Sequence, residues 1–86
     1  MTYASEDMLA DDSDVGLEML RRCRLAEERW GTFRSTHEVY GVLAEEFAEM
    51  LDAIHADDMT QAQLEAIDIA AVAYRFARDG IERDPS

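Results

Sequence analysis

An amphipathic helix is encoded by residues 35–56, which read STHEVYGVLAEEFAEMLDAIHA. Ser35 followed by Glu38 is typical of a capping box, so the helix is expected to begin there and to continue to about Ala56. Its apolar residues recur at steps of three and four, namely Val39, Leu43, Phe47, Met50 and Ile54. This stretch therefore predicts a helix with one apolar face.

A further helix is expected before it, from Ser13 or Asp14 to about Trp30. Gly31 fits the position that follows a helix C-terminus. The apolar residues of this stretch also follow helical spacing, and they are Val15, Met19, Cys23, Ala26 and Trp30. The same stretch holds a basic cluster of Arg21, Arg22 and Arg24, which we expect on a solvated face, paired with neighbouring acids.

A third helix is expected over residues 61–78, with Thr60 and Gln63 as its capping box and Gly80 after its end. Residues 67–74, IDIAAVAY, are apolar on nearly every side, which is typical of a helix buried all round. A chain of 86 residues can hardly cover such a helix alone. We therefore predict an all-α protein, a three-helix chain that forms an oligomeric helical bundle.

Composition restricts the function. Twenty acidic residues face eight basic ones, all of them Arg, and the formal net charge is −12. Binding to nucleic acid needs clustered cations, so this charge argues against it. The sequence has neither a long apolar run nor the basic flank of a signal peptide, so we expect no membrane partner. The single cysteine, Cys23, excludes an intrachain disulfide.

Four carboxylates point towards apolar residues when the expected helices are drawn at about 100° per residue. On the second helix, Glu46 lies about 20° outside an apolar arc of about 80°, and Glu49 lies at its margin. On the third helix, Glu65 and Asp68 fall between apolar residues. An unpaired buried carboxylate costs several kcal/mol. These acids therefore need a cation partner or a raised pKa.

A divalent cation is a natural partner for the four acids. The only basic residues of the second and third helices are Arg75 and Arg78, too few to neutralise four inward carboxylates. All-oxygen ligands favour Mg²⁺, Mn²⁺ or Ca²⁺ over zinc. Acids three residues apart share a helix face, so two such pairs can converge on one ion. Acidic pairs are also common on solvated surfaces, and on the residues alone both interpretations stay open.

The acidic pattern resembles a known metal signature. Residues 45–49, EEFAE, have the form E-E-x-x-E, and residues 65–68, EAID, have the form E-x-x-D, with fifteen residues between them. This resembles the MazG-like, all-α nucleoside triphosphate pyrophosphohydrolases. Residues 37–46 and 68–77 look like the stretches that flank the motif in small bacterial and phage members. The resemblance covers residues 35–79, about half of the chain.

This resemblance implies a fold, an activity and a set of site residues. The fold would be the helical bundle of the all-α pyrophosphatases, as a homodimer or homotetramer. The reaction would cleave a nucleoside triphosphate between its α- and β-phosphates, giving a monophosphate and pyrophosphate. Mg²⁺, or Mn²⁺ in its place, would be held by Glu46, Glu49, Glu65 and Asp68. Glu45 would orient water or bind a further ion, so the catalytic acids would be Glu45, Glu46 and Glu49.

The resemblance also implies groups that bind the substrate. Family members often use a Lys near the phosphates, and some use an Asn, and this chain contains neither. Arg75, two helical turns beyond Asp68 on the same face, is the expected replacement, with Arg78 or Arg34 as alternatives. Trp30 has two possible roles, stacking on a base or packing where the first and second helices meet.

Two other functions fit the composition. A non-catalytic nucleotide- and metal-binding protein on the same scaffold would keep the ligands without turnover. An acidic helical interaction protein, such as a mimic of a polyanion, would bind a basic partner and need no metal. The inward placement of Glu46 and Asp68 argues against mimicry, which needs its acids outside.

Three segments are expected along the chain. Residues 1–12 would be an acidic, flexible leader, residues 13–80 the MazG-like helical domain, and residues 81–86 a C-terminal tail. The lone cysteine and the acidic N-terminus favour the cytoplasm. The resemblance implies a bacterial protein, or a phage-encoded one in the cytoplasm of its host.

Overall fold

The computed structural model describes residues 12–82, and all the regular structure in that part is helical. Helix α2 spans Asp12–Trp30, α3 spans Thr36–His55 and α4 spans Met59–Asp79. The predicted all-α class and the three helices are confirmed. No strand occurs within these residues, and none of the three helices has the length and apolar character needed to cross a bilayer.

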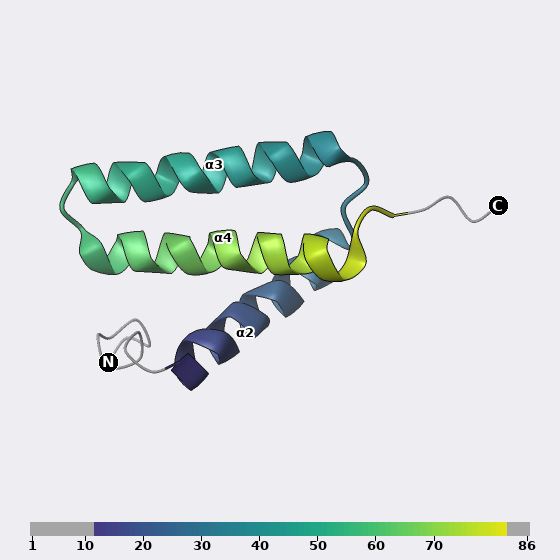
Figure 1. Ribbon diagram of the computed structural model, residues 1–86, viewed down its shortest axis with the longest axis horizontal. Coiled ribbons are helices and arrows are strands. Elements are labelled where there is room, and N and C mark those ends of the chain that lie inside the picture. Colours follow the sequence, from purple (N-terminus) through teal and green to yellow (C-terminus); the bar gives the residue numbers. More distant parts are fainter. Residues whose placement is uncertain (1–11, 83–86) are drawn as a thin grey trace.

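Helices α3 and α4 form an antiparallel hairpin, and α2 crosses one side of it (Figure 1). The contact between α3 and α4 is the most extensive, and α2 packs mainly against α4. In Figure 1, α2 passes behind the C-terminal half of α4. The opposite side of the hairpin therefore carries no helix from the described part of the chain.

The end of α2 and the start of α3 follow the sequence closely. Gly31 has a positive φ of 73°, which favours glycine, and its N–H donates to the carbonyl of Glu27 at 2.9 Å. Ser35 Oγ accepts a hydrogen bond from the backbone N–H of Glu38 at 3.1 Å. The carboxylate of Glu38 accepts from the backbone N–H of Arg34 at 2.7 Å. Ser35 thus caps α3 as predicted, and Glu38 reaches back to the N–H of Arg34 rather than to that of Ser35. Both bonds stabilise the first turn of α3.

The start of α4 differs from the prediction. Asp58 is its N-cap, and the carboxylate accepts a hydrogen bond from the backbone N–H of Gln61 at 3.1 Å. The helix therefore begins at Met59 rather than Gln61, and the prediction that Thr60 caps it is wrong. The physical reason is that an Asp carboxylate accepts hydrogen bonds from first-turn N–H groups at least as well as a Thr hydroxyl does. Because Asp58 precedes Thr60 in the chain, capping by Asp58 starts the helix two residues earlier.

The fully buried core is small. Phe33, Val39 and Val72 form its centre, and Val42, Leu43 and Ile81 pack against them. Glu82, which the sequence places in the tail together with Ile81, donates its backbone N–H to the carbonyl of Phe33 at 2.6 Å. Residues 83–86 lie outside the described residues, as does the predicted leader apart from Asp12, which begins α2.

Only part of the apolar face predicted for α3 is covered. Val39 is buried, and Leu43 and Met50 are half-buried, but Phe47 remains 52% exposed and Ile54 is also exposed. On α4, the segment expected to be buried all round is covered on one side, and its Ala73 and Tyr74 face solvent. The described chain therefore leaves apolar surface on both helices of the hairpin.

Candidate metal centre

Three glutamates converge where α3 lies against α4. Glu46 and Glu49 are one helical turn apart on α3, and Glu65 lies across from them on α4. One carboxylate oxygen from each residue lies within 4.8 Å of the others. The spacing of three places the first two on neighbouring positions of one helix side, and the antiparallel hairpin brings the third opposite them. We call these residues the glutamate cluster.

Burial and mutual repulsion perturb the cluster. Burial raises the pKa of Glu46 to about 7, and the charges of Asp68, Glu49 and Glu65 add to this effect. Glu49 is exposed, and the limited desolvation that it undergoes, followed by the charge of Glu65, raises its pKa. Like charges held this close disfavour the ionised form. Ionisation of the three carboxylates therefore costs free energy, and a bound cation would offset that cost.

Two oxygens of the cluster have no hydrogen-bond partner although they are buried, Glu46 Oε2 and Glu65 Oε1. The other oxygen of Glu65 accepts a hydrogen bond from Gln61 Nε2 at 2.8 Å. A buried polar atom without a partner costs about 1–3 kcal/mol. A donor set made only of carboxylate oxygens suits Mg²⁺ or Mn²⁺. The residues present therefore fit a divalent cation.

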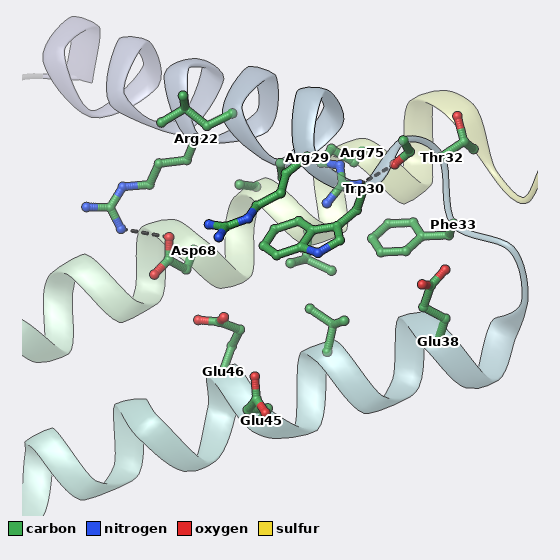
Figure 2. Close-up of a pocket in the computed structure, with 16 residues that line it drawn as sticks. Arg22, Arg29, Trp30, Thr32, Phe33, Glu38, Glu45, Glu46, Asp68 and Arg75 are labelled. Carbon is green, nitrogen blue, oxygen red and sulfur yellow. Dashed lines mark hydrogen bonds and ion pairs between the residues drawn. The ribbon is translucent and has the colours of Figure 1, made fainter.

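Asp68, the fourth predicted ligand, is bound by an arginine. Arg22 Nη1 lies 2.7 Å from Asp68 Oδ1 and also donates to the carbonyl of Leu64 at 3.1 Å (Figure 2). Arg22 Nε donates to Glu18 Oε2 at 2.7 Å. Asp68 still lies close enough for its charge to raise the pKa of Glu46. Asp68 thus borders the glutamate cluster, and its positively charged partner is Arg22 on α2.

The position of Arg22 corrects one expectation. The sequence predicts a solvated basic face, but the side chain of Arg22 is only 15% exposed because α2 lies against α4. Arg21 does fit that expectation, since it is half exposed and pairs with Glu18 at 2.8 Å. Hydrogen bonds from Arg21 and Arg22 lower the pKa of the buried Glu18. A signal for the inward position existed, because Arg22 lies about 40° from Ala26 on the helix wheel.

A pocket of about 440 Å³ opens beside the glutamate cluster, between the three helices (Figure 2). Glu46 belongs to both the pocket and the cluster. Glu45, a predicted catalytic residue, is exposed on the pocket wall. The charged and aromatic residues of the lining are Arg22, Arg29, Trp30, Phe33, Glu38, Glu45, Glu46, Asp68 and Arg75. The pocket thus combines acids, cations and aromatic rings next to the candidate metal site.

Two of the three predicted substrate-binding residues line this pocket. Arg75 is buried, donates to the carbonyl of Gly31 at 2.8 Å and lies over the ring of Phe33 at 4.4 Å from its centroid. Trp30 is 61% exposed, and the guanidinium of Arg29 lies 5.3 Å from the centroid of its ring. Packing between the first and second helices therefore does not account for Trp30.

Arg78 lies away from the pocket. Its guanidinium pairs with Glu27 on α2 and with Asp79, which lies 2.6 Å away. The hydrogen bond to Asp79 raises the pKa of Arg78 and lowers that of its partner. Arg29, in the last turn of α2, lines the pocket but was not predicted as a site residue. Phe33 also lines the pocket, and it is buried in the core, as hydrophobic packing would place it.

Known proteins offer no guide to this site. The chain matches no protein-family model, no curated protein and no solved structure. Any function assigned to the chain must therefore be argued from the glutamate cluster, the adjacent pocket and the motifs that build them.

Proposed function

We propose that this protein is a Mg²⁺-dependent nucleoside triphosphate pyrophosphohydrolase of the MazG-like type, acting as a homo-oligomer. It would convert a nucleoside triphosphate into a monophosphate and pyrophosphate. The proposal rests chiefly on the convergence of Glu46, Glu49 and Glu65, two of whose oxygens are buried without a partner. The E-E-x-x-E and E-x-x-D motifs therefore supply neighbouring carboxylates from two helices, as a shared metal site requires.

The acids would have different roles at the metal centre. Glu46, Glu49 and Glu65 would hold the cation, with Asp68 beside them. A bound Mg²⁺ would offset phosphate charge and lower the pKa of the attacking water. Glu45, exposed on the pocket wall, can accept a proton from that water.

The pocket offers groups for the rest of a nucleotide. Its volume of about 440 Å³ falls within the range usual for small-molecule sites. The exposed indole of Trp30 can stack on a base. Arg29 and Arg75 line the same space and can hold phosphate oxygens. Because Arg75 already donates to the carbonyl of Gly31, a phosphate would use its remaining N–H groups.

A second candidate is a nucleotide- and metal-binding protein without turnover. The observation that favours it is the ion pair between Arg22 and Asp68, which occupies the fourth predicted ligand. A centre of three carboxylates would bind a cation less tightly than a centre of four. Such a protein would bind a nucleotide together with Mg²⁺ and release it unchanged.

Pyrophosphate release from a panel of ribo- and deoxynucleoside triphosphates, with and without Mg²⁺, tests the proposal. Glu49→Gln removes one charge from the cluster, and Asp52→Asn, an exposed acid on the same helix outside it, is the matched control. Metal-dependent release that is lost only in Glu49→Gln supports the enzyme. No release, with a nucleotide-dependent rise in melting temperature, supports the binding protein. No release and no shift would contradict both.

A further inference from the structure

Arg22 reaches across from α2 to the edge of the candidate metal centre. Its Nη1 lies 2.7 Å from Asp68 Oδ1 and 3.1 Å from the carbonyl oxygen of Leu64, both on α4. Its Nε donates to Glu18 Oε2, on its own helix, at 2.7 Å. Because the side chain is only 15% exposed, water competes poorly with these contacts. The guanidinium thus joins two carboxylates, one on α2 and one that borders the glutamate cluster.

This guanidinium lies where the pocket meets the metal centre. Arg22, Glu46 and Asp68 all line the pocket. In Figure 2 these three residues lie towards one end of it, and Phe33 and Glu38 lie towards the other. A nucleotide with its phosphates at the glutamate cluster would therefore place them beside Arg22.

Glu18 keeps Arg22 at this position whichever other partner it has. Glu18 is 4% exposed and accepts hydrogen bonds from Arg21 and Arg22, which lower its pKa. A carboxylate held by two guanidinium groups stays ionised at neutral pH. The Nε of Arg22 therefore remains tethered, while its Nη1 can exchange one oxygen acceptor for another.

Asp68 lies close to the glutamate cluster without being one of its three converging residues. Burial and the charge of Asp68 raise the pKa of Glu46, so the two carboxyl groups are near neighbours. The side chain of Asp68 is 34% exposed, so packing leaves it room to turn. A cation at the cluster would attract the Asp68 carboxylate and repel the Arg22 guanidinium. The ion pair therefore opposes the binding of a cation that uses Asp68.

Phosphate groups would favour separation of the same pair. A phosphate beside Arg22 offers the guanidinium a charged acceptor in place of Asp68, and it repels the Asp68 carboxylate. A cation and phosphates that bind together therefore favour the same rearrangement. Either one alone breaks the ion pair with less compensation.

We propose that Arg22 exchanges partners when the cation and the nucleotide bind. In the metal-free protein it holds Asp68 away from the glutamate cluster. In the complex it binds the phosphates and releases Asp68, which joins the cluster as the fourth carboxylate ligand. This inference rests on the proposed function, and it couples the binding of the cation to that of the phosphates through one side chain.

Isothermal titration calorimetry with Mn²⁺ alone tests the contact with Asp68. Arg22→Met should lower the dissociation constant for Mn²⁺ by about tenfold, because Asp68 is released and a nearby positive charge is lost. Arg24→Met removes the same charge from an exposed position of α2 and should change the constant much less. In an Asp68→Asn background, Arg22→Met should tighten Mn²⁺ binding much less, since no carboxylate is released.

The fluorescence of Trp30 at saturating Mg²⁺ tests the contact with phosphates. The ligands are the α,β-methylene analogues of the nucleoside triphosphate panel, which cannot be cleaved between the α- and β-phosphates. Arg22→Met should raise their dissociation constants at least about tenfold, and Arg24→Met should not. A purely structural role of Arg22 would not tighten the binding of one ligand while weakening that of the other.

Far-UV circular dichroism shows whether each variant remains helical. If Arg22→Met unfolds, Arg22→Lys carries the test, because its single ammonium keeps a cation beside Glu18 but cannot span two carboxylates. Arg22→Lys should also tighten the binding of Mn²⁺.

Three results would overturn the inference: Mn²⁺ affinity that does not rise when Arg22 is replaced, an equal rise in Arg24→Met, or an unchanged affinity for the analogues. If the wild-type chain nevertheless releases pyrophosphate from the panel, the inference fails and the proposed function stands. Absence of Mn²⁺ binding in the wild type and in every variant would overturn both.

Discussion

Arg22 on α2 and Asp68 on α4 form an ion pair of 2.7 Å that joins the first helix to the hairpin. The same guanidinium also holds the buried Glu18, so it links two carboxylates from different helices. Within residues 12–82 no arginine pairs with Glu46 or its two partners in the glutamate cluster. The four predicted metal ligands thus differ, because Asp68 pairs with Arg22 of α2 and the three residues of the glutamate cluster have no such partner.

Arg22→Met should destabilise the metal-free protein by about 1–3 kcal/mol, because Asp68 loses its partner and Glu18 keeps only Arg21. Urea unfolding in EDTA measures the change. Arg24→Met, an exposed position on the same helix, should cost much less. The double variant with Asp68→Asn should reveal a coupling energy of about 1 kcal/mol, and strict additivity would contradict the contact.

Glu46 should make the metal-free protein less stable as the pH rises. Folding raises its pKa from 4.5 to about 7, so the folded state favours the protonated form. The stability that this proton contributes is complete below about pH 4.5 and is lost as the pH rises through 7. Glu46→Gln keeps a neutral side chain and should gain about 1 kcal/mol at pH 8, a figure that allows for the partial exposure of Glu46.

Unfolding curves in EDTA at pH 5 and pH 8 test this dependence. The gain from Glu46→Gln should be much smaller at pH 5 than at pH 8. Asp52→Asn removes the same charge from an exposed position of α3, and should show no comparable difference between the two pH values. An equal gain in both variants would assign the effect to net charge rather than to the cluster.

Two glycines should respond to alanine in opposite directions. Gly31 has a φ of 73°, so Gly31→Ala forces a left-handed conformation on an L-residue and should cost about 1 kcal/mol. Gly41 lies exposed inside α3 with open space around it, and Gly41→Ala should stabilise by about 0.5–1 kcal/mol through helix propensity. Thermal unfolding of the two variants measures these changes in stability. A loss of stability in both variants would contradict the backbone conformations described for Gly31 and Gly41.

Trp30 should report nucleotide binding directly, because it is the single tryptophan of the chain and lies on the pocket wall. A nucleotide added with Mg²⁺ should change its fluorescence, whereas Mg²⁺ alone should not. Trp30→Ala should raise KM by about tenfold with a smaller effect on kcat, since stacking on the base supports binding more than the chemical step. A change in kcat alone would argue against a stacking role.

Local patterns predicted the three helices and all three residues of the glutamate cluster. The Ser35–Glu38 capping box and the glycine after Trp30 depend on neighbours in the sequence, so the sequence sufficed for both. The convergence of Glu46 with Glu65 required only helical spacing and an antiparallel neighbour. The N-cap of α4 was missed because the Thr60–Gln63 pattern was interpreted as the capping box, two residues after Asp58.

The partners made by packing a third helix could not be predicted from the sequence. Its wheel position near Ala26 indicates that Arg22 can point inward, but it does not reveal that α2 lies on α4 and that Asp68 is the partner. The same holds for Phe33, which is buried under Arg75 only because the chain turns back after α2. The exposure of Phe47 was likewise hidden, since an apolar stripe looks the same whether its own chain or a second copy covers it.

Isothermal titration calorimetry of the metal-free protein with Mg²⁺ and Mn²⁺ tests most directly the central claim, that the glutamate cluster binds a divalent cation. The wild-type chain should bind a divalent cation, and Glu46→Gln and Glu65→Gln should each weaken the binding by at least about tenfold. Asp52→Asn should bind as the wild type does. Absence of binding, or equal binding by all four proteins, would contradict a metal centre at the glutamate cluster.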